Sequence, residues 1–269
     1  MVEDTDIIIT NSITDIVSIK LAAHYTHALC TRGRLDFKYA GRDFSLKAGD
    51  CMIILYNELI SDLMPSDDFE TTVLYATYPF IMEYLPANNY DIIGRMTMFR
   101  DPIIPLTDTE CRTYIHDIEE IRARLEKPHR FKRDMMGYQM EIFVLDLFDF
   151  HARYYGDAVV SKQQANLLRR FVELLQTGDF RSHREVSFYA ARLCVTPKYL
   201  SEVCKKISGV SANFWIDRFA IVEIIQLLSR KDLTLQQIVD EMNFSSLSYF
   251  SRYVQRILNV TPSEFRNRL

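Results

Sequence analysis

The sequence predicts an α+β protein of two domains: a β-rich N-terminal domain that ends in two helices, and an all-α C-terminal domain. Short apolar runs with partial alternation fill residues 7–105, which is typical of strands. From Asp108 onward the apolar residues recur with the period of a helix. The length of 269 residues allows two ordinary domains, which we place at 1–157 and 161–269.

Turn signals separate the strands expected in the first hundred residues. Phe37–Leu46 has the pattern of a hairpin, with its turn at Ala40–Arg42. Lys47–Asp50 is a second turn, and it leads into the buried run Cys51–Tyr56. Val73–Tyr78 is a further strand with β-branched and aromatic content. Several short strands at this spacing favour a β-sandwich or a β-barrel.

Two helices are expected to close the N-terminal domain, at 108–126 and 131–155. The second is apolar on more than one side, so one side should pack on the strands and the other on a partner subunit. Asp157–Ser161 is the candidate linker. The residues expected to form the dimer interface are Met136, Met140, Phe143 and Leu147.

Two segments of the C-terminal domain have the pattern of a helix-turn-helix unit, Ser187–Lys206 and Leu235–Arg256. The second helices of the two units begin near Thr196 and Ser245, 49 residues apart. Between the units, Phe214–Ser229 is a single amphipathic helix that would fix their separation.

Local signals in the second unit define each part of the pattern. Thr234 and Gln237 fit a capping box before the first helix. Asn243 stands at the turn, where a left-handed backbone is expected. Ser245 or Ser246 would cap the second helix.

The charge is distributed unevenly along the chain. Residues 1–160 hold 16 Lys and Arg against 26 Asp and Glu, a net charge of −10. Residues 161–269 hold 16 against 10, a net charge of +6. A basic domain is attracted to the phosphate backbone of nucleic acid, so the overall charge of −4 does not argue against DNA binding.

Two tandem units in a basic domain predict sequence-specific binding to double-stranded DNA, with the second helix of each unit in the major groove. Glu202 is unusual on such a face; it would accept a hydrogen bond from cytosine or limit non-specific binding. The candidate DNA-binding residues are Thr196, Lys198, Tyr199, Ser201, Glu202, Lys205, Ser245, Ser246, Leu247, Ser248, Tyr249, Arg252 and Arg256.

Catalytic and metal chemistry have little support in the sequence. His24 and His27 are three apart in an expected strand, so they would point to opposite faces and not bind one metal. The five cysteines have no CxxC spacing, which suits free thiols in a reducing cytoplasm. Motifs such as GxSxG, GxGxxG and HExxH do not occur. We therefore expect no enzyme activity, cofactor or metal, and no membrane association.

Aromatic residues are plentiful in the N-terminal half. Most should fill the β-domain, and some would line a pocket for a small molecule, with an arginine as an anchor for an anion. The candidate ligand-binding residues are Arg32, Arg34, Tyr39, Tyr56 and Tyr75.

The stretch from Leu235 to Arg266 closely resembles the signature of the AraC/XylS family of bacterial transcription regulators, and the resemblance covers roughly residues 165–269. Asn243 and Asn259 stand where that signature has glycines, and both tolerate a positive φ. Glu202 stands where some members have a base-contacting arginine. The resemblance implies that the N-terminal domain is a cupin-like sensing domain followed by a helical dimerisation pair.

These observations predict a cytoplasmic, homodimeric transcription regulator that binds promoter DNA under the control of a small molecule in its N-terminal domain. RNA polymerase is a further candidate partner. One alternative is a ligand-independent dimeric regulator whose N-terminal domain only oligomerises. The other is a cupin-type enzyme fused to a DNA-binding domain. A polar-lined pocket would favour the first hypothesis, a core filled by aromatic residues the second, and a bound metal the third.

Overall fold

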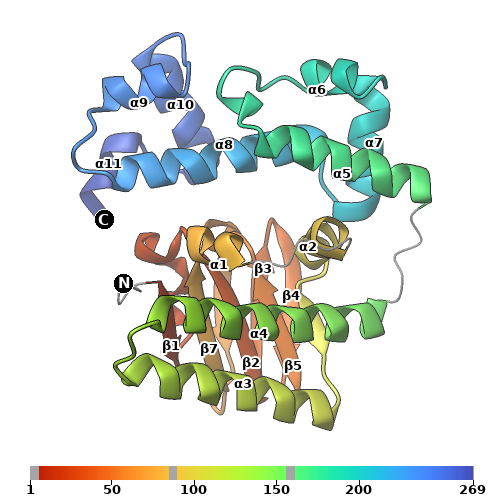
Figure 1. The fold of residues 1–269 in the computed structure, drawn as a ribbon, viewed down its shortest axis with the longest axis vertical. Coiled ribbons are helices and arrows are strands. Elements are labelled where there is room, and N and C mark those ends of the chain that lie inside the picture. Colours follow the sequence, from red (N-terminus) through yellow and green to blue (C-terminus); the bar gives the residue numbers. More distant parts are fainter. Residues whose placement is uncertain (1–5, 85–89, 156–160, 269) are drawn as a thin grey trace. The chain divides into compact units, whose positions relative to one another are not determined.

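Two antiparallel sheets form the N-terminal part of the chain (Figure 1). A computed structural model describes residues 6–84, 90–155 and 161–268. One sheet has the strand order β1-β7-β2-β5-β8 and the other β4-β3-β6. The strands are β1 Ile7–Thr10, β2 His24–Arg32, β3 Arg34–Tyr39, β4 Arg42–Lys47, β5 Asp50–Ile54, β6 Ile60–Pro65, β7 Glu70–Thr77 and β8 Ile103–Pro105. The sheets stay separate across the described strands, so the expected barrel does not close there.

Both predicted turns are present. Ala40 and Gly41, with φ of 50° and 76°, form the two-residue turn that joins β3 to β4, because Tyr39 pairs with Arg42. In the second turn the backbone N–H of Lys47 donates to the carboxylate of Asp50 over 2.9 Å. The hairpin and the start of β5 are therefore set by local sequence.

The two faces of the five-stranded sheet are covered differently. The helix α4, Lys132–Tyr155, lies along one face, where the ring of Phe143 contacts His27 of β2. Tyr75 is paired in register with Thr26, the neighbour of His27, so it faces away from α4. Tyr75 and Tyr39, from the two different sheets, are fully buried. Aromatic side chains thus fill the core on the side of the sheet that α4 does not cover.

The described residues of this unit contain four α-helices: α1 Tyr78–Tyr84, α2 Tyr90–Arg100, α3 Asp108–Glu126 and α4. The ranges of α3 and α4 agree with the sequence prediction. The prediction of strands throughout 7–105 was wrong at α1 and α2. Pro79 was interpreted as the end of a strand, but it occupies the first turn of α1, where its missing N–H costs no hydrogen bond. In α2, Gly94 interrupts an already weak helical pattern.

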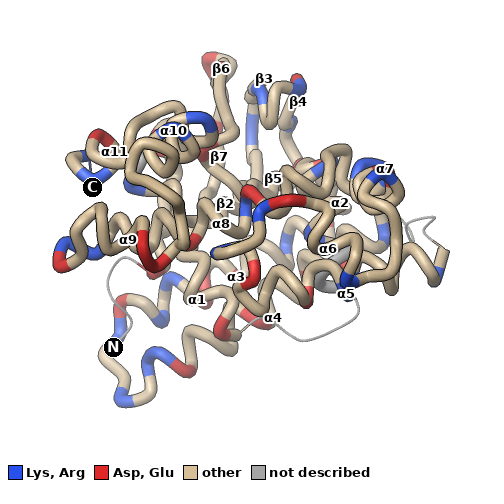
Figure 2. Tube along the Cα trace, turned by 90° about the horizontal axis from the view of Figure 1, so that it is seen from above, with Lys and Arg blue, Asp and Glu red and all other residues tan. Residues whose placement is uncertain are grey.

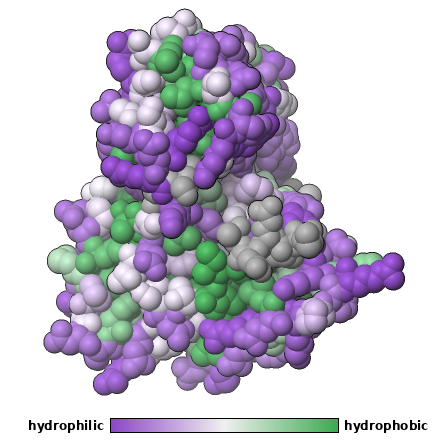
Figure 3. Space-filling model, turned by 90° about the vertical axis from the view of Figure 1, so that its left-hand side faces the viewer, coloured by the Kyte–Doolittle hydropathy of each residue, from purple (hydrophilic) through white to green (hydrophobic). Residues whose placement is uncertain are grey.

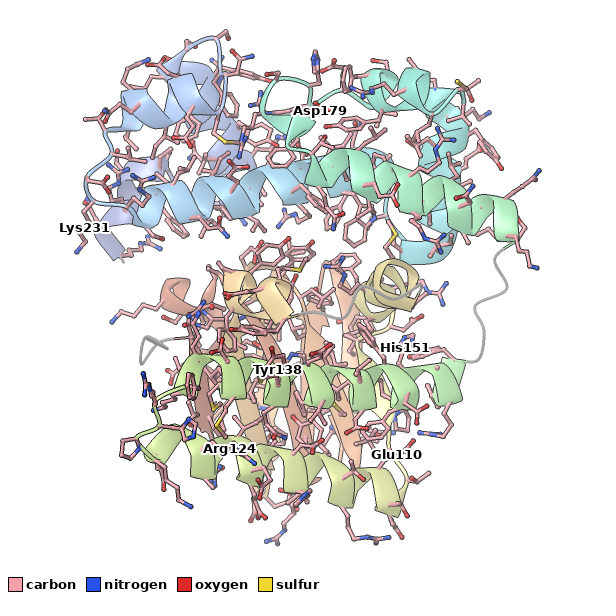
Figure 4. The ribbon with its side chains drawn as sticks, viewed as in Figure 1. Glu110, Arg124, Tyr138, His151, Asp179 and Lys231 are labelled. Atoms are coloured by element: carbon pink, nitrogen blue, oxygen red, sulfur yellow. The ribbon has the colours of Figure 1, made fainter. Side chains whose placement is uncertain are left out.

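The assignment of the dimer interface needs correction. Met136, Met140, Phe143 and Leu147 are buried inside their own unit, each with 1% or less of its surface exposed, so they are not available to a partner. The opposite side of α4 carries Tyr138, Ile142 and Leu145, which are 61%, 50% and 41% exposed. We call these three residues the outer face of α4. Figure 4 labels Tyr138 on this helix, and Figure 3 shows other apolar areas on the surface of the unit.

An ion pair joins α3 to α4. Glu110, at the start of α3, completes a capping box with Thr107 and accepts a hydrogen bond from Arg153 of α4 over 2.5 Å. Figure 4 labels Glu110 at the corresponding end of the helix pair. The antiparallel pair α3 and α4 is therefore fixed at one end by charge and along its length by packing.

The C-terminal part of the chain forms a second compact unit, residues 159–269, against 1–158 for the first. Its described residues form helices without strands: α5 Lys162–Gln176, α6 Val186–Arg192, α7 Pro197–Ser208, α8 Ala212–Ser229, α9 Leu235–Glu241, α10 Leu247–Leu258 and α11 Pro262–Arg268. Ser161 caps α5, and the rest of the predicted linker, residues 157–160, lies outside the described residues. Among the described helices, none has the length and apolarity needed to cross a membrane.

Candidate nucleic-acid interface

The first helix-turn-helix unit consists of α6 and α7. Cys194, between the two helices, has a left-handed backbone with φ of 57°. The hydroxyl of Thr196 then accepts a hydrogen bond from the backbone N–H of Tyr199 over 3.1 Å, and Pro197 is the first residue of α7. Gly209, with φ of 78°, ends the helix. The turn and the cap therefore fix where α7 begins.

The second unit, α9 and α10, repeats this construction. The predicted capping box of Thr234 and Gln237 is confirmed. Asn243 has the expected left-handed backbone, with φ of 50°. Of the two serines considered, Ser246 caps α10, since its hydroxyl accepts from the N–H of Tyr249 over 3.2 Å.

Cys194 and Asn243 are equivalent positions in the two units. They lie 49 residues apart, the same spacing as Thr196 and Ser245. The sequence analysis did not identify Cys194 as a turn residue, because cysteine is not a residue type that favours positive φ. The internal spacing was the signal that could have found it.

We call α7 and α10 the recognition helices. Each has a buried side, which holds Leu200 and Val203 in α7 and Phe250 and Val254 in α10. The opposite sides face solvent: all the candidate DNA-binding residues are exposed except Ser201, which is half-buried. Figure 2 shows Lys and Arg along both recognition helices. The structure thus gathers the candidates onto two solvent-facing helix surfaces.

Three charged candidates differ in their surroundings. Glu202 lies one turn from Lys198, with its carboxylate 3.9 Å from the ammonium, so it partly offsets that positive charge. Arg256 pairs with Asp217 of α8 over 3.1 Å and lies over the ring of Tyr253. Arg252 makes no ion pair with another described residue. Arg252 is therefore the arginine of α10 most available to DNA.

A contact between the two units was missed by the sequence analysis. Arg184, just before α6, places its guanidinium 3.8 Å from the ring centre of Phe244 and donates to the carbonyl of Met242, next to the turn of the second unit. The side-chain amide of Asn243 donates to the hydroxyl of Ser182 over 3.1 Å. No local pattern signals these contacts, because about sixty residues separate the partners.

The predicted ligand residues do not come together. Arg32 and Arg34 are exposed on the sheet and pair with Asp68 and Asp36, so they form no buried anchor for an anion. Tyr39 and Tyr75 are fully buried in the core, and Tyr56 packs on Phe99 of α2. This set is therefore corrected: two members are surface ion pairs and three are packing residues.

The fold and the site together place this chain in the class of proteins with two tandem helix-turn-helix units. A helix, a left-handed turn and a capped helix occur twice, on either side of α8. The family described as "Helix-turn-helix domain" matches residues 189–268. Regulatory protein PocR of Salmonella typhimurium is 30% identical over 100 residues, which cover 37% of this chain and 32% of PocR. The C-terminal unit of the chain is thus a helix-turn-helix domain similar to that of PocR, in line with the resemblance to AraC/XylS regulators.

Other relatives match over the same part of the chain. HTH-type transcriptional regulator ExsA of Pseudomonas aeruginosa is 27% identical over 107 residues, 40% of this chain and 38% of ExsA. The arabinose operon regulatory protein of Salmonella typhimurium is 28% identical over 85 residues, 32% of this chain and 30% of that protein. The alignments thus span about a third of the length of these relatives.

Solved structures resemble the chain over both units. ToxT from Vibrio cholerae strain SCE256, solved with an unsaturated fatty acid bound, has a TM-score of 0.53 and 16% identity. The match covers 91% of this chain and 87% of ToxT. The ToxT structure from Vibrio cholerae O395 gives the same TM-score at 14% identity, with coverage of 98% and 94%. These likenesses show a shared fold, an N-terminal sheet unit followed by a helical unit.

Proposed function

We propose that this protein is a sequence-specific DNA-binding transcription regulator that reads promoter DNA with its two recognition helices. The observation that carries the proposal is their matched construction: α7 and α10 follow the same left-handed turn, start at a side-chain cap and expose polar and basic residues. The contacts of Arg184 hold the two units together, which suits the reading of two successive boxes.

Selection of DNA sites from a random pool by the full chain, at one fixed moderate salt concentration, tests the proposal. We expect a motif with two boxes whose centres lie about one helical turn, roughly 10 base pairs, apart. Enrichment of a single box would contradict the joint use of both helices. Absence of enrichment by the full chain and also by residues 161–269 alone, which lack the proposed control by the N-terminal unit, would contradict the proposed function.

We further propose that a small molecule bound in the N-terminal unit controls DNA binding. The fatty acid in the ToxT structure, a protein with the same fold, supports this idea. On the side of the sheet that α4 does not cover, Tyr39 and Tyr75 fill the core. This packing argues against a ligand on that side and favours a separate cavity. The cupin-like character of this unit and the domain limits 1–157 and 161–269 remain part of the proposal.

Homodimer formation through the outer face of α4 completes the proposed function. Three exposed apolar or aromatic residues on one long helix, Tyr138, Ile142 and Leu145, favour contact with a second copy of the same face. RNA polymerase is a further partner that a promoter-bound regulator would contact. The rival hypothesis, a regulator without a ligand, predicts the same dimer and the same DNA motif but no response to small molecules.

A further inference from the structure

A cavity lies at the loop where α3 turns back into α4. It has a volume of about 320 Å³, which is within the range of small-molecule sites. Met135 and Met136 of α4 form part of its apolar wall. Its polar lining residues are Glu120, Arg124, Lys127, His129 and Lys132. Figure 4 labels Arg124 near the end of α3, beside this loop. The cavity thus combines room for a small molecule with three cationic side chains.

The charge of this loop is opposite to that of its unit. Residues 122–133 hold six of the sixteen Lys and Arg of residues 1–160, against a single carboxylate, that of Glu126. Residues 1–160 as a whole carry a net charge of −10. Of the six cations, Arg133 pairs with Asp6 and Glu83, and three others line the cavity. Because like charges repel one another, this concentration of cations favours an anion as the occupant of the cavity.

Hydrogen bonds within the loop hold the cations at one end of the helix pair. Pro128 follows the end of α3, and the backbone N–H of Lys127 donates to the carbonyl of Arg124 over 3.3 Å. The ammonium of Lys132 donates to the carbonyl of Leu125 over 2.6 Å. Since Leu125 is the neighbour of Arg124, this bond brings the charge of Lys132 to the same turn of α3 that carries Arg124.

The wall of the cavity keeps N–H groups available to a ligand. Arg124 donates to Glu120 through Nη2 over 3.2 Å, and its Nη1 has no partner among the described residues. The ammonium of Lys127 is exposed and makes no ion pair with a described residue. Nδ1 of His129 accepts a hydrogen bond from the backbone N–H of Phe131 over 3.1 Å, so Nε2 carries a hydrogen and can donate. Three side chains of the wall therefore present uncommitted donors.

We propose that this cavity binds a small organic phosphate monoester. Three cations and one carboxylate give the wall a net charge of +2, which matches the dianion that a phosphate monoester forms above about pH 7. The three terminal oxygens of the phosphate accept hydrogen bonds from Arg124, Lys127 and Lys132, and the organic group lies against Met135 and Met136. A carboxylate has a single charge and two oxygens, so it would satisfy fewer of these donors. This inference rests on the proposed control by a small molecule and names the chemical class of that molecule.

The position of the cavity also connects the ligand to α4. Met135 lines the cavity in the first turn of α4, and the outer face of the same helix begins at Tyr138, about one turn later. A phosphate held by Arg124 of α3 and Lys132 of α4 joins the two helices at their loop end. Occupancy of the cavity would therefore stabilise one position of the helix that we propose as the dimer interface.

Calorimetric titration of the full chain at about pH 8 with phenyl phosphate, phenyl sulfate and inorganic phosphate tests the inference. The two phenyl esters have nearly the same shape, but the phosphate is a dianion and the sulfate a monoanion. We expect phenyl phosphate to bind more tightly than phenyl sulfate by roughly fivefold or more, the effect of one further unit charge close to the cations in water. It should also bind more tightly than inorganic phosphate, which lacks an apolar group. Equal affinity for the two phenyl esters would overturn the inference.

Variants of the cavity wall locate the binding site. Lys127→Gln and Arg124→Gln should each weaken the binding of phenyl phosphate by roughly three- to tenfold, the range for contacts with a charge that stay partly exposed to solvent. Both side chains reach the surface, so the fold should survive, and urea unfolding of each variant checks this.

Arg122→Gln is the matched control. Arg122 is exposed on α3, two residues from Arg124, and it does not line the cavity. Its replacement removes the same charge from the same helix and should change the affinity for phenyl phosphate little. An equal loss of affinity in Arg122→Gln and Arg124→Gln would show a diffuse attraction between the ester and the basic loop, and it would overturn the site.

Failure of this inference and failure of the proposed function give different results. A preparation that selects a DNA motif but binds neither phenyl ester, or both equally, overturns the cavity inference and leaves DNA reading intact. So does a Lys127→Gln variant that loses affinity for the DNA motif and not for phenyl phosphate, because the loop would then contact the DNA backbone. A preparation that binds phenyl phosphate through Arg124 and Lys127, while neither the full chain nor residues 161–269 alone selects a DNA motif, supports the cavity and overturns the proposed function.

Discussion

The guanidinium of Arg184 lies 3.8 Å from the ring centre of Phe244, and this stacked pair links the two helix-turn-helix units. The same guanidinium donates to the carbonyls of Arg181 and Met242. A planar group with several donors can stack and donate in two directions at once, which an ammonium cannot do. Arg184 therefore sets the orientation of the second unit relative to the first.

The first prediction follows from this geometry. Arg184→Lys should lower the free energy of unfolding by about 1–3 kcal/mol, because it removes the stacking and leaves a partly buried carbonyl without its donor. Affinity for a two-box DNA site should fall more than affinity for one box. Urea unfolding and titration of labelled DNA measure the two effects.

Arg192→Lys is the matched control for this experiment. Arg192 also lies over an aromatic ring, that of Phe188 in α6, and pairs over 3.2 Å with Asp179, which precedes α6, so neither partner belongs to the second unit. Figure 4 labels Asp179 in this region. If Arg192→Lys reduced two-box binding as strongly as Arg184→Lys, a specific coupling role for Arg184 would be ruled out.

A second prediction concerns direct reading of bases. Arg252→Ala should weaken binding to the selected motif by about 1–3 kcal/mol and relax the preference at one base, if Arg252 contacts a guanine. Binding constants for the motif and for each single-base variant measure this. A uniform loss over all sequences would instead identify a phosphate contact. Arg230→Ala, at an exposed arginine paired with Asp232 outside the recognition helices, should change little.

A third prediction concerns the left-handed turn of the first unit. Cys194→Gly should raise the free energy of unfolding by about 1 kcal/mol, because glycine adopts a positive φ without the steric cost of a Cβ. Asn243→Gly should raise the free energy of unfolding by less, because asparagine tolerates this conformation and its amide also donates to Ser182. Ala191→Gly, in the neighbouring helix α6, should destabilise by about 0.5–1 kcal/mol. Stabilisation by Ala191→Gly as well would contradict the backbone explanation.

The parts of this fold that the sequence predicted correctly are those set by local signals. The capping box of Thr234, the hairpin turn at Gly41 and the left-handed Asn243 each depend on neighbours a few residues away. A stripe of apolar residues likewise gave the range of α3. These features depend on backbone geometry and periodicity, which are encoded in short stretches.

The parts that were missed depend on contacts between distant residues. The apolar sides of α4 were recognised, but which side faces the sheet is decided by Phe143 packing on His27 of β2. The candidate DNA-binding residues were all identified from the helix-turn-helix motif. That motif does not reveal Arg184, because Arg184 contacts Phe244, which is sixty residues away in the sequence. His27 and Arg95 likewise line one small cavity, and no pattern in the sequence places those two residues together.

A fourth prediction concerns two carboxyl groups between α3 and α4. Asp117 is buried and hydrogen-bonded to Asp146, and burial together with that neighbouring carboxylate raises the pKa of Asp117 to about 6. The folded state therefore binds a proton more tightly than the unfolded state. The stability that this proton contributes is fully present below about pH 4 and is lost as the pH rises to about 6.

Asp117→Asn should consequently raise the free energy of unfolding at pH 7.5, by on the order of 1–2 kcal/mol, and have little effect at pH 4. Urea unfolding at a series of pH values measures the difference. Asp149→Asn, at an exposed aspartate of α4, should leave the dependence on pH unchanged. The same pH dependence in the Asp117→Asn variant and in the unaltered protein would show that this pair does not titrate as described.

The last prediction tests the proposed dimer. Ile142 is half exposed at the centre of the outer face of α4, between Tyr138 and Leu145. In an isologous dimer, Ile142→Arg places two like charges at one apolar contact, so the variant should be monomeric where the unaltered protein is dimeric. Sedimentation equilibrium measures the mass. Because the side chain points to solvent in one subunit, the thermal stability of a monomer should hardly change.

Val17→Arg is the control for a general effect of added charge. Val17 is 56% exposed on the N-terminal unit, away from α4 in sequence, and its replacement should leave the dimer intact. A dimer that survives Ile142→Arg would exclude the outer face of α4. If Val17→Arg alone disrupted the dimer, the interface would have to lie at Val17 and not at α4. The reason is that an added charge disrupts an apolar contact between subunits only where the partner buries that charge.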